Sequence, residues 1–195
     1  HHRPDPDTPL EETAEALMQL VRQGKTLYIG ISNYNGEDTK KMSAILREMN
    51  APFIIHQMRY NMFSRELLEQ DLAPVLEETG LGAITFSPLA QGLLTKRYLH
   101  GIPEDSRAHR KEIPFLSEDQ VTPTLGKIKQ LQDLADLRGQ TLAQMALAWN
   151  LRQESVTSVL VGASRLSQLE ESVRMMDNLS FSPEEEQKIE QILGH

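Results

Sequence analysis

The amino-acid sequence predicts an α/β fold built around a parallel β-sheet. Short apolar runs alternate with helical patterns along the chain, and no hairpin signal joins one run to the next. The runs are almost continuously apolar, as strands are when helices cover both faces of a parallel sheet. The first three runs end at Ile31, His56 and Phe86. Their spacing is close to the roughly 31 residues per unit of a (β/α)₈ barrel.

The predicted elements follow one another in a regular order. An amphipathic helix begins after Thr8 and ends at Gly24, and its apolar face includes Leu17 and Val21. The predicted strands are Leu27–Ile31, Phe53–His56, Gly82–Phe86 and Val156–Val161. The later predicted helices are 37–48, 71–80, 123–137, 142–151, 166–175 and one that ends near residue 193. The stretch 89–121 is rich in polar residues and is expected to be a loop excursion.

Several helix starts carry a recognisable cap. A capping box, in which a Ser or Thr and a Glu or Gln three residues later bond each other's backbone, is predicted at Thr8, Thr141 and Ser182. Asp71 is expected to cap its own helix, with Pro74 in the first turn.

Four full strands and the end of a fifth are too few to close an eight-stranded barrel. The strand count leaves two alternatives. The chain forms roughly the C-terminal half of a (β/α)₈ barrel, or it forms an open α/β sheet. In either case we expect residues 1–195 to form a single domain, because the sequence has no linker or low-complexity tract.

Composition excludes several classes of function. The 195 residues include 28 Asp and Glu against 20 Lys and Arg, a net charge of −8, which disfavours general binding to nucleic acid. The chain has no cysteine, so disulfides, thiolate metal sites and cysteine nucleophiles are excluded. No apolar run approaches the roughly 20 residues that span a bilayer. We therefore expect a soluble, cytoplasmic protein.

Hydrogen-bonding residues follow each predicted strand. The segments are Ser32–Asn35, His56–Asn61, Ser87–Gly92 and Gly162–Arg165. Loops are generally polar, but four such segments in succession favour one shared site, because the chemistry of a βα barrel lies at the carboxyl ends of its strands.

The chemistry of these segments suits a nucleotide. Asn33 and Gln57 offer the paired donor and acceptor that a carboxamide requires. The Gly162–Ser164 turn opens a helix and supplies backbone N–H groups for phosphate. Arg165 and the Lys96–Arg97 pair add positive charge, although a solvated surface pair is an alternative for the latter. The sequence has neither the G-x-G-x-x-G fingerprint nor a P-loop.

Four motifs together resemble the aldo-keto reductases. They are LYIGISNY at 27–34, IHQMRYN at 55–61, FSPLAQGLL at 86–94 and VGAS at 161–164 followed by QLEE at 168–171. The resemblance is strongest to the branch that includes bacterial L-glyceraldehyde 3-phosphate reductases and potassium-channel β subunits. It implies a (β/α)₈ TIM barrel, of which this chain would cover about the C-terminal half, strands 5 to 8 plus the end of strand 4.

The resemblance also implies an NADP site. Ser32, Asn33 and Gln57 match positions that hold the nicotinamide carboxamide, and Phe86 matches the position against the nicotinamide ring. At the pyrophosphate, the matching positions are Ser87, Leu89, Gly92 and Arg97, and Arg107 matches a basic position in the loop over the cofactor. At the adenosine end, they are Gly162, Ser164, Gln168 and Glu171, with Arg165 beside the 2′-phosphate. No metal site is expected.

The family's catalytic tetrad consists of Asp, Tyr, Lys and His. His2, in the run His2–Asp5, matches the tetrad histidine, which orients the substrate carbonyl. A tag remnant or a fortuitous metal pair would also account for His1 and His2, and the Arg-Pro-Asp-Pro continuation disfavours a tag. The Asp, Tyr and Lys of the family lie upstream, so the chain as given is expected to lack them.

The resemblance implies NADPH-dependent reduction of small aldehydes, such as glyceraldehyde 3-phosphate or methylglyoxal, by the protein that also contains the N-terminal half of the barrel. One alternative is a cofactor-binding regulatory subunit like the potassium-channel β subunits. Another is an inactive fragment that associates through exposed strand edges. The expected partner is a small aldehyde rather than nucleic acid or a membrane, and a homo-oligomer is compatible with the family.

Overall fold

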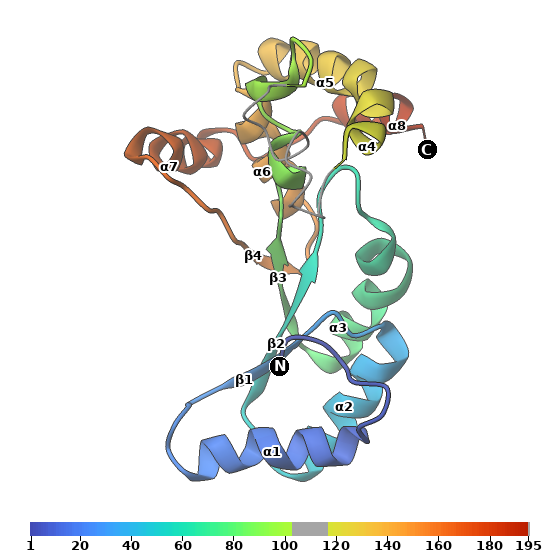
Figure 1. The fold of residues 1–195 in the computed structure, drawn as a ribbon, viewed down its shortest axis with the longest axis vertical. Coiled ribbons are helices and arrows are strands. Elements are labelled where there is room, and N and C mark those ends of the chain that lie inside the picture. Colours follow the sequence, from blue (N-terminus) through green and yellow to red (C-terminus); the bar gives the residue numbers. More distant parts are fainter. Residues whose placement is uncertain (103–116, 195) are drawn as a thin grey trace. The chain divides into compact units, whose positions relative to one another are not determined.

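A computed structural model describes residues 1–102 and 117–194 of the chain (Figure 1). The strands are β1 (Ile29–Ser32), β2 (Phe53–Arg59), β3 (Gly82–Phe86) and β4 (Val156–Val159). The longer helices are α1 (Leu10–Arg22), α2 (Gly36–Glu48), α3 (Ala73–Thr79), α5 (Leu125–Leu137), α6 (Leu142–Leu151), α7 (Leu166–Val173) and α8 (Pro183–Leu193). The short helical segments are η1 (Leu67–Leu72), η2 (Ala90–Gly92), η3 (Lys96–Tyr98), α4 (Glu118–Val121), η5 (Thr122–Thr124) and η6 (Arg174–Asp177).

The chain divides into two compact units. The first consists of His1–Tyr60, Ser64–Phe86 and Glu154–Ser158. The second consists of Asn61–Phe63, Ser87–Gln153 and Val159–His195. The expectation that residues 1–195 form a single domain stays a prediction.

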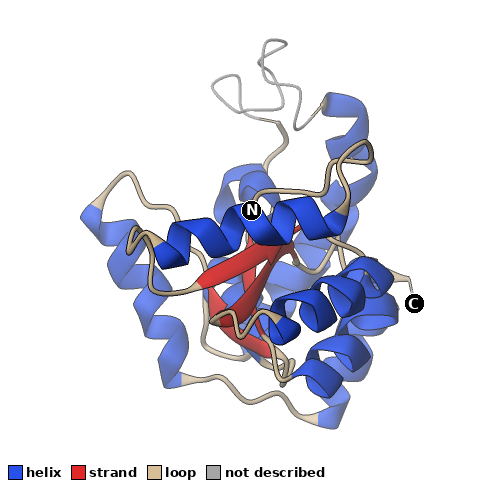
Figure 2. Cartoon of the chain, turned by 90° about the horizontal axis from the view of Figure 1, so that it is seen from below, coloured by secondary structure: helices blue, strands red, loops and turns tan. Residues whose placement is uncertain are grey.

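The first unit contains the sheet, whose strands are red in Figure 2. The strand order is β1-β2-β3-β4. β1 pairs with β2, and β2 with β3, in parallel, as the alternation of apolar runs and helices predicted. All four predicted strands are present, but three have other bounds than expected. β1 is Ile29–Ser32 rather than Leu27–Ile31, β2 extends three residues further to Arg59, and β4 ends at Val159 rather than Val161. Between α1, α2 and β1 lies a core of Ala14, Ile29, Ile31, Tyr34, Met42 and Leu46, all of them buried.

The second unit is mainly helical, and α6 is its most buried helix. Eight of the ten residues of α6 are buried, including Trp149 and Met145. The capping boxes predicted at Thr141 and Ser182 are both present, with Gln144 and Glu185 as the reciprocal partners. In the described part of the chain, no helix has the length and apolar character required to cross a bilayer.

Two predicted caps are wrong. The hydroxyl of Thr8 donates to Asp5 Oδ2 at 2.9 Å, so it is used in the preceding turn, and α1 begins after Pro9 without a side-chain cap. Asp71 lies inside a helical segment that already begins at Leu67. Its Oδ2 instead accepts from the backbone N–H of Gly36, at the start of α2, at 2.7 Å. A Cβ on Gly36 would lie 2.4 Å from Asp71 Oδ1, so only glycine allows this approach.

Candidate functional site

In the first unit, three predicted cofactor residues share one face of the sheet. The register pairs Ser32 with Gln57 and Arg59 with Phe86. Side chains two residues apart on a strand lie on the same face, so Ser32, Gln57 and Phe86 all belong to one face. Each lies at or near the carboxyl end of its strand, where the sequence predicted a shared site.

Asn33 follows β1 directly and adopts a left-handed backbone with φ of 60°. Its side-chain Nδ2 donates to Ser32 Oγ and to the backbone carbonyl of His2, both at 2.9 Å. The contact brings the segment containing His2 to the carboxyl end of β1, while the His2 side chain remains exposed. Asparagine is one of the few residues besides glycine that adopt this conformation readily, so Asn33 suits the tight turn that follows β1.

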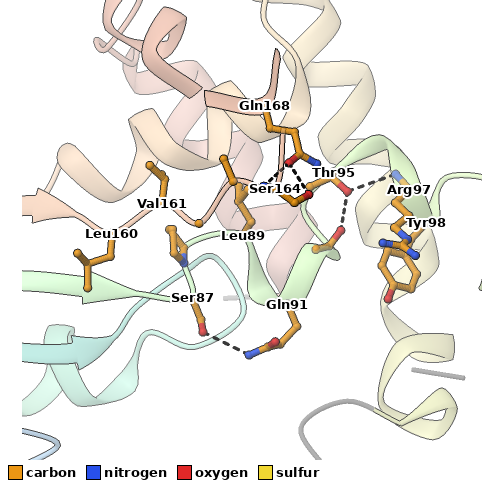
Figure 3. Close-up of a pocket in the computed structure, with 14 residues that line it drawn as sticks. Ser87, Leu89, Gln91, Thr95, Arg97, Tyr98, Leu160, Val161, Ser164 and Gln168 are labelled. Atoms are coloured by element: carbon orange, nitrogen blue, oxygen red, sulfur yellow. Dashed lines mark hydrogen bonds between the residues drawn. The ribbon is translucent and has the colours of Figure 1, made fainter. Parts of the chain in front are cut away.

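In the second unit, the segments after β3 and β4 line a pocket of about 630 Å³ (Figure 3). Its volume is in the range of small-molecule and cofactor sites. The lining residues are Ser87, Pro88, Leu89, Gln91, Gly92, Thr95, Arg97, Tyr98, Leu160, Val161, Gly162, Ala163, Ser164 and Gln168.

Backbone strain is concentrated in the turn after β3. Ser87, Ala90 and Gln91 have φ values of 53°, 47° and 60°. The Ser87 carbonyl accepts from the backbone N–H of Ala90 at 3.0 Å and from Asn61 Nδ2 at 2.9 Å. The Ser87 hydroxyl accepts from Gln91 Nε2 at 3.3 Å. These bonds hold a turn conformation that non-glycine residues rarely adopt.

At the opposite side of the pocket, Gln168 occupies the start of α7 (Figure 3). Its Oε1 accepts from the backbone N–H groups of Ser164 and Arg165 at 2.9 and 3.2 Å, and from Ser164 Oγ at 3.1 Å. The Gln168 Oε1 therefore occupies the position at the start of a helix where backbone N–H groups commonly bind anions.

The charge of the pocket is opposite to that of the chain. The net charge of the protein is −8, yet the fourteen described lining residues include one arginine, Arg97, and no carboxylate. Hydroxyls, amides and one guanidinium form a donor set that fits a phosphate-bearing ligand such as the pyrophosphate of a dinucleotide.

The structure brings seven of the predicted cofactor residues into this one pocket. They are Ser87, Leu89, Gly92, Arg97, Gly162, Ser164 and Gln168. Arg165 and Glu171 are not among the lining residues: Arg165 is exposed at the start of α7, and the backbone carbonyl of Glu171 accepts from Gln144 Nε2 at 3.1 Å. Arg107 lies outside the described residues.

Several lining residues were not predicted from the sequence, among them Gln91, Thr95 and Tyr98. Gln91 lies between Leu89 and Gly92, which were both predicted, so its place in the sequence could have indicated a lining residue. Nothing in the periodicity pointed to Tyr98, which is buried in the short segment η3. In the described part of the chain, no group of three or more His, Asp or Glu side chains gathers as a metal site requires.

The sequence of residues 1–193 matches the Aldo/keto reductase family. The chain belongs to this family. Its parallel sheet is part of the family's (β/α)₈ TIM barrel, in agreement with the resemblance found in the sequence.

Known aldo/keto reductases of two kinds are similar to the chain. It is 50% identical over 193 residues to L-glyceraldehyde 3-phosphate reductase of Escherichia coli O157:H7, covering 97% of this chain and 56% of that protein. The protein of the same name from Escherichia coli strain K12 is 49% identical over the same length. The solved glycerol dehydrogenase AKR11B4 from Gluconobacter oxydans superposes with a TM-score of 0.80 at 28% identity, over 99% of this chain and 57% of that one. The chain thus spans a little over half the length of these relatives.

Proposed function

We propose that this aldo/keto reductase chain forms the cofactor-holding part of an NADPH-dependent reductase of small aldehydes, such as glyceraldehyde 3-phosphate or methylglyoxal. The pocket of the second unit carries the proposal, because it gathers seven residues expected at the cofactor and has no carboxylate among its described lining residues. The identity of 50% to an L-glyceraldehyde 3-phosphate reductase supports the substrate class. The proposal concerns the full-length protein, acting in the cytoplasm.

Each part of the cofactor is assigned to residues of this chain. Ser32, Asn33 and Gln57 would hold the nicotinamide carboxamide, with Phe86 against the ring. Ser87, Leu89, Gly92 and Arg97 would hold the pyrophosphate. Gly162, Ser164, Gln168 and Glu171 would bind the adenosine end. The Gln168 oxygen that now accepts from the start of α7 would release those N–H groups to an anionic ligand.

Bound NADPH supplies the hydride, and the protein orients the reactants. Gln57 suits its role because its side-chain amide has no hydrogen bond within the described part of the chain and offers both a donor and an acceptor. The Nδ2 of Asn33 already donates to Ser32 and His2, so its Oδ1 is the atom that would accept a hydrogen bond from the carboxamide. His2 would orient the substrate carbonyl.

The direct test is a steady-state assay of the full-length protein. We expect oxidation of NADPH that depends on added glyceraldehyde 3-phosphate or methylglyoxal and saturates with each. A fluorescence titration would measure NADPH binding in parallel. Binding of NADPH without turnover of any small aldehyde would contradict the reductase proposal and favour a regulatory role.

The choice of NADPH over NADH is assigned to Arg165. It is exposed next to Ser164, a pocket-lining residue, where its guanidinium would pair with a 2′-phosphate. Arg165→Ala should weaken NADPH binding by about 10-fold or more and leave NADH binding nearly unchanged, because NADH lacks that phosphate. Titration of the variant with both cofactors checks this, and equal losses would rule out the assignment.

A further inference from the structure

Arg59 lies at the carboxyl end of β2, two residues beyond Gln57. Two residues of strand advance the chain by about 7 Å and return the side chain to the same face. Arg59 therefore shares the face of Gln57, whereas Met58 between them is buried on the other face. This places a cation on the face that holds the expected carboxamide-binding residues.

The backbone of Arg59 is fixed by the neighbouring strand. The register pairs it with Phe86, the residue expected against the nicotinamide ring. The next residue, Tyr60, donates its backbone N–H to the Phe86 carbonyl at 3.4 Å and is itself fully buried. The ladder thus continues past Arg59, and a well-fixed strand end positions its side chain better than a free loop would.

Arg59 differs from its neighbour Arg65 in its charge partner. Arg65 donates to Glu69 Oε2 through Nε and Nη2 at 3.0 and 2.8 Å, and its side chain is only 12% exposed. Arg59 is exposed and forms no ion pair with any carboxylate in the described part of the chain. In a protein with eight more acidic than basic groups, this guanidinium is available to an external anion.

We infer that Arg59 binds a phosphate carried by the aldehyde substrate, and this inference rests on the proposed function. The guanidinium presents forked donors that match a phosphate. Its offset of about 7 Å along the strand from Gln57 suits a short carbon chain, with the carbonyl near the nicotinamide and the phosphate at the other end. Arg59 is thus a specificity-determining residue that favours phosphorylated aldehydes.

The test compares two substrates that differ only in the phosphate. In the full-length protein, kcat/KM is measured for glyceraldehyde 3-phosphate and for glyceraldehyde, with NADPH affinity measured separately by fluorescence. Arg59→Gln should lower kcat/KM for the phosphorylated aldehyde by about 10- to 100-fold, mainly through KM, because one charge-assisted contact is lost. The value for glyceraldehyde should stay within about twofold, and Arg59→Lys should restore part of the selectivity.

A matched control removes the same charge elsewhere. Lys40→Gln acts at an exposed residue of α2 and should change neither value. If Arg59→Gln leaves the ratio of kcat/KM for the two aldehydes unchanged, the inference is overturned. The proposed function still stands in that case if the unaltered protein binds NADPH and reduces both aldehydes. Failure of the unaltered protein to bind NADPH would overturn the proposed function and this inference together.

Discussion

Asn61 shows how one buried side chain controls the strained turn of the pocket. It is 2% exposed, its Nδ2 donates to the Ser87 carbonyl at 2.9 Å, and its Oδ1 accepts from the Phe63 N–H at 2.9 Å. Asn61→Ala should therefore weaken NADPH binding by about 10-fold, because the turn at Ser87 loses a bond that holds its positive φ. A fluorescence titration of the full-length variant measures the change.

Asn150 provides the matched control for this prediction. It is also fully buried, and its Nδ2 donates to a backbone carbonyl at the same distance, 2.9 Å, but that carbonyl belongs to Ala146 within α6. Asn150→Ala and Asn61→Ala should both lower the free energy of unfolding, by about 1–3 kcal/mol. NADPH affinity should fall only in Asn61→Ala. A similar fall in both variants would show that general destabilisation, rather than the turn, determines the effect.

At the scale of elements, the sequence predicted the strands and helices well and their caps less well. The strand Gly82–Phe86 and the capping boxes at Thr141 and Ser182 are as expected, because periodicity and capping are local properties. Thr8 and Asp71 were misassigned because their side chains bond to Asp5 and Gly36 instead. The second of these partners is 35 positions away in the sequence, and no local pattern predicts such a contact.

Arg138, in the loop between α5 and α6, bonds to α8 and to the residues just before it. Its side chain is 2% exposed, donates to Glu185 Oε2 at 2.5 Å and to the Ser180 carbonyl at 3.0 Å, and lies 3.9 Å from the centre of the Phe181 ring. Arg138→Met should lower the free energy of unfolding by about 3–5 kcal/mol, because it leaves a partly buried carboxylate without its partner. Urea denaturation measures the loss.

The exposed ion pair between Lys40 and Glu78 is the comparison for Arg138. Both side chains are more than half exposed, so solvent screens their attraction. Lys40→Gln should cost less than about 1 kcal/mol in the same denaturation experiment. A comparable loss in the two variants would contradict the role assigned to the buried arginine.

At the scale of the whole molecule, the motifs identified the family and half of the described residues that line one pocket, seven of fourteen. The segments after β3 and β4 follow two strands of one sheet, and seven residues predicted there line one pocket. Arg165, the residue before α7, and Glu171, within that helix, are not among the lining residues, and the motif spacing does not distinguish them from Ser164 and Gln168, which are. The strain at Ser87, the bond from Asn61 and the position of Gln168 depend on tertiary contacts, which spacing alone does not reveal.

The stability of the protein should depend on pH through His56. This residue of β2 is fully buried, and its ring Nε2 donates to the Tyr34 carbonyl at 3.2 Å. Its Nδ1 has no hydrogen-bond partner among residues 1–102 and 117–194. Burial lowers the pKa of His56 from 6.5 to about 4, since the charged ring would lose its hydration.

Because the pKa of His56 in the folded protein lies below its unfolded value, folding disfavours protonation of this ring. Its contribution to stability is complete above about pH 6.5 and is lost as the pH falls toward about 4, by at most about 1.4 kcal/mol per pH unit. Thermal unfolding of the full-length protein between about pH 7 and about pH 4.5 should show this decline. In His56→Gln the decline should be shallower, since glutamine does not titrate, whatever the stability of the variant at neutral pH. An equally steep decline in the variant would show that other groups determine the acid sensitivity.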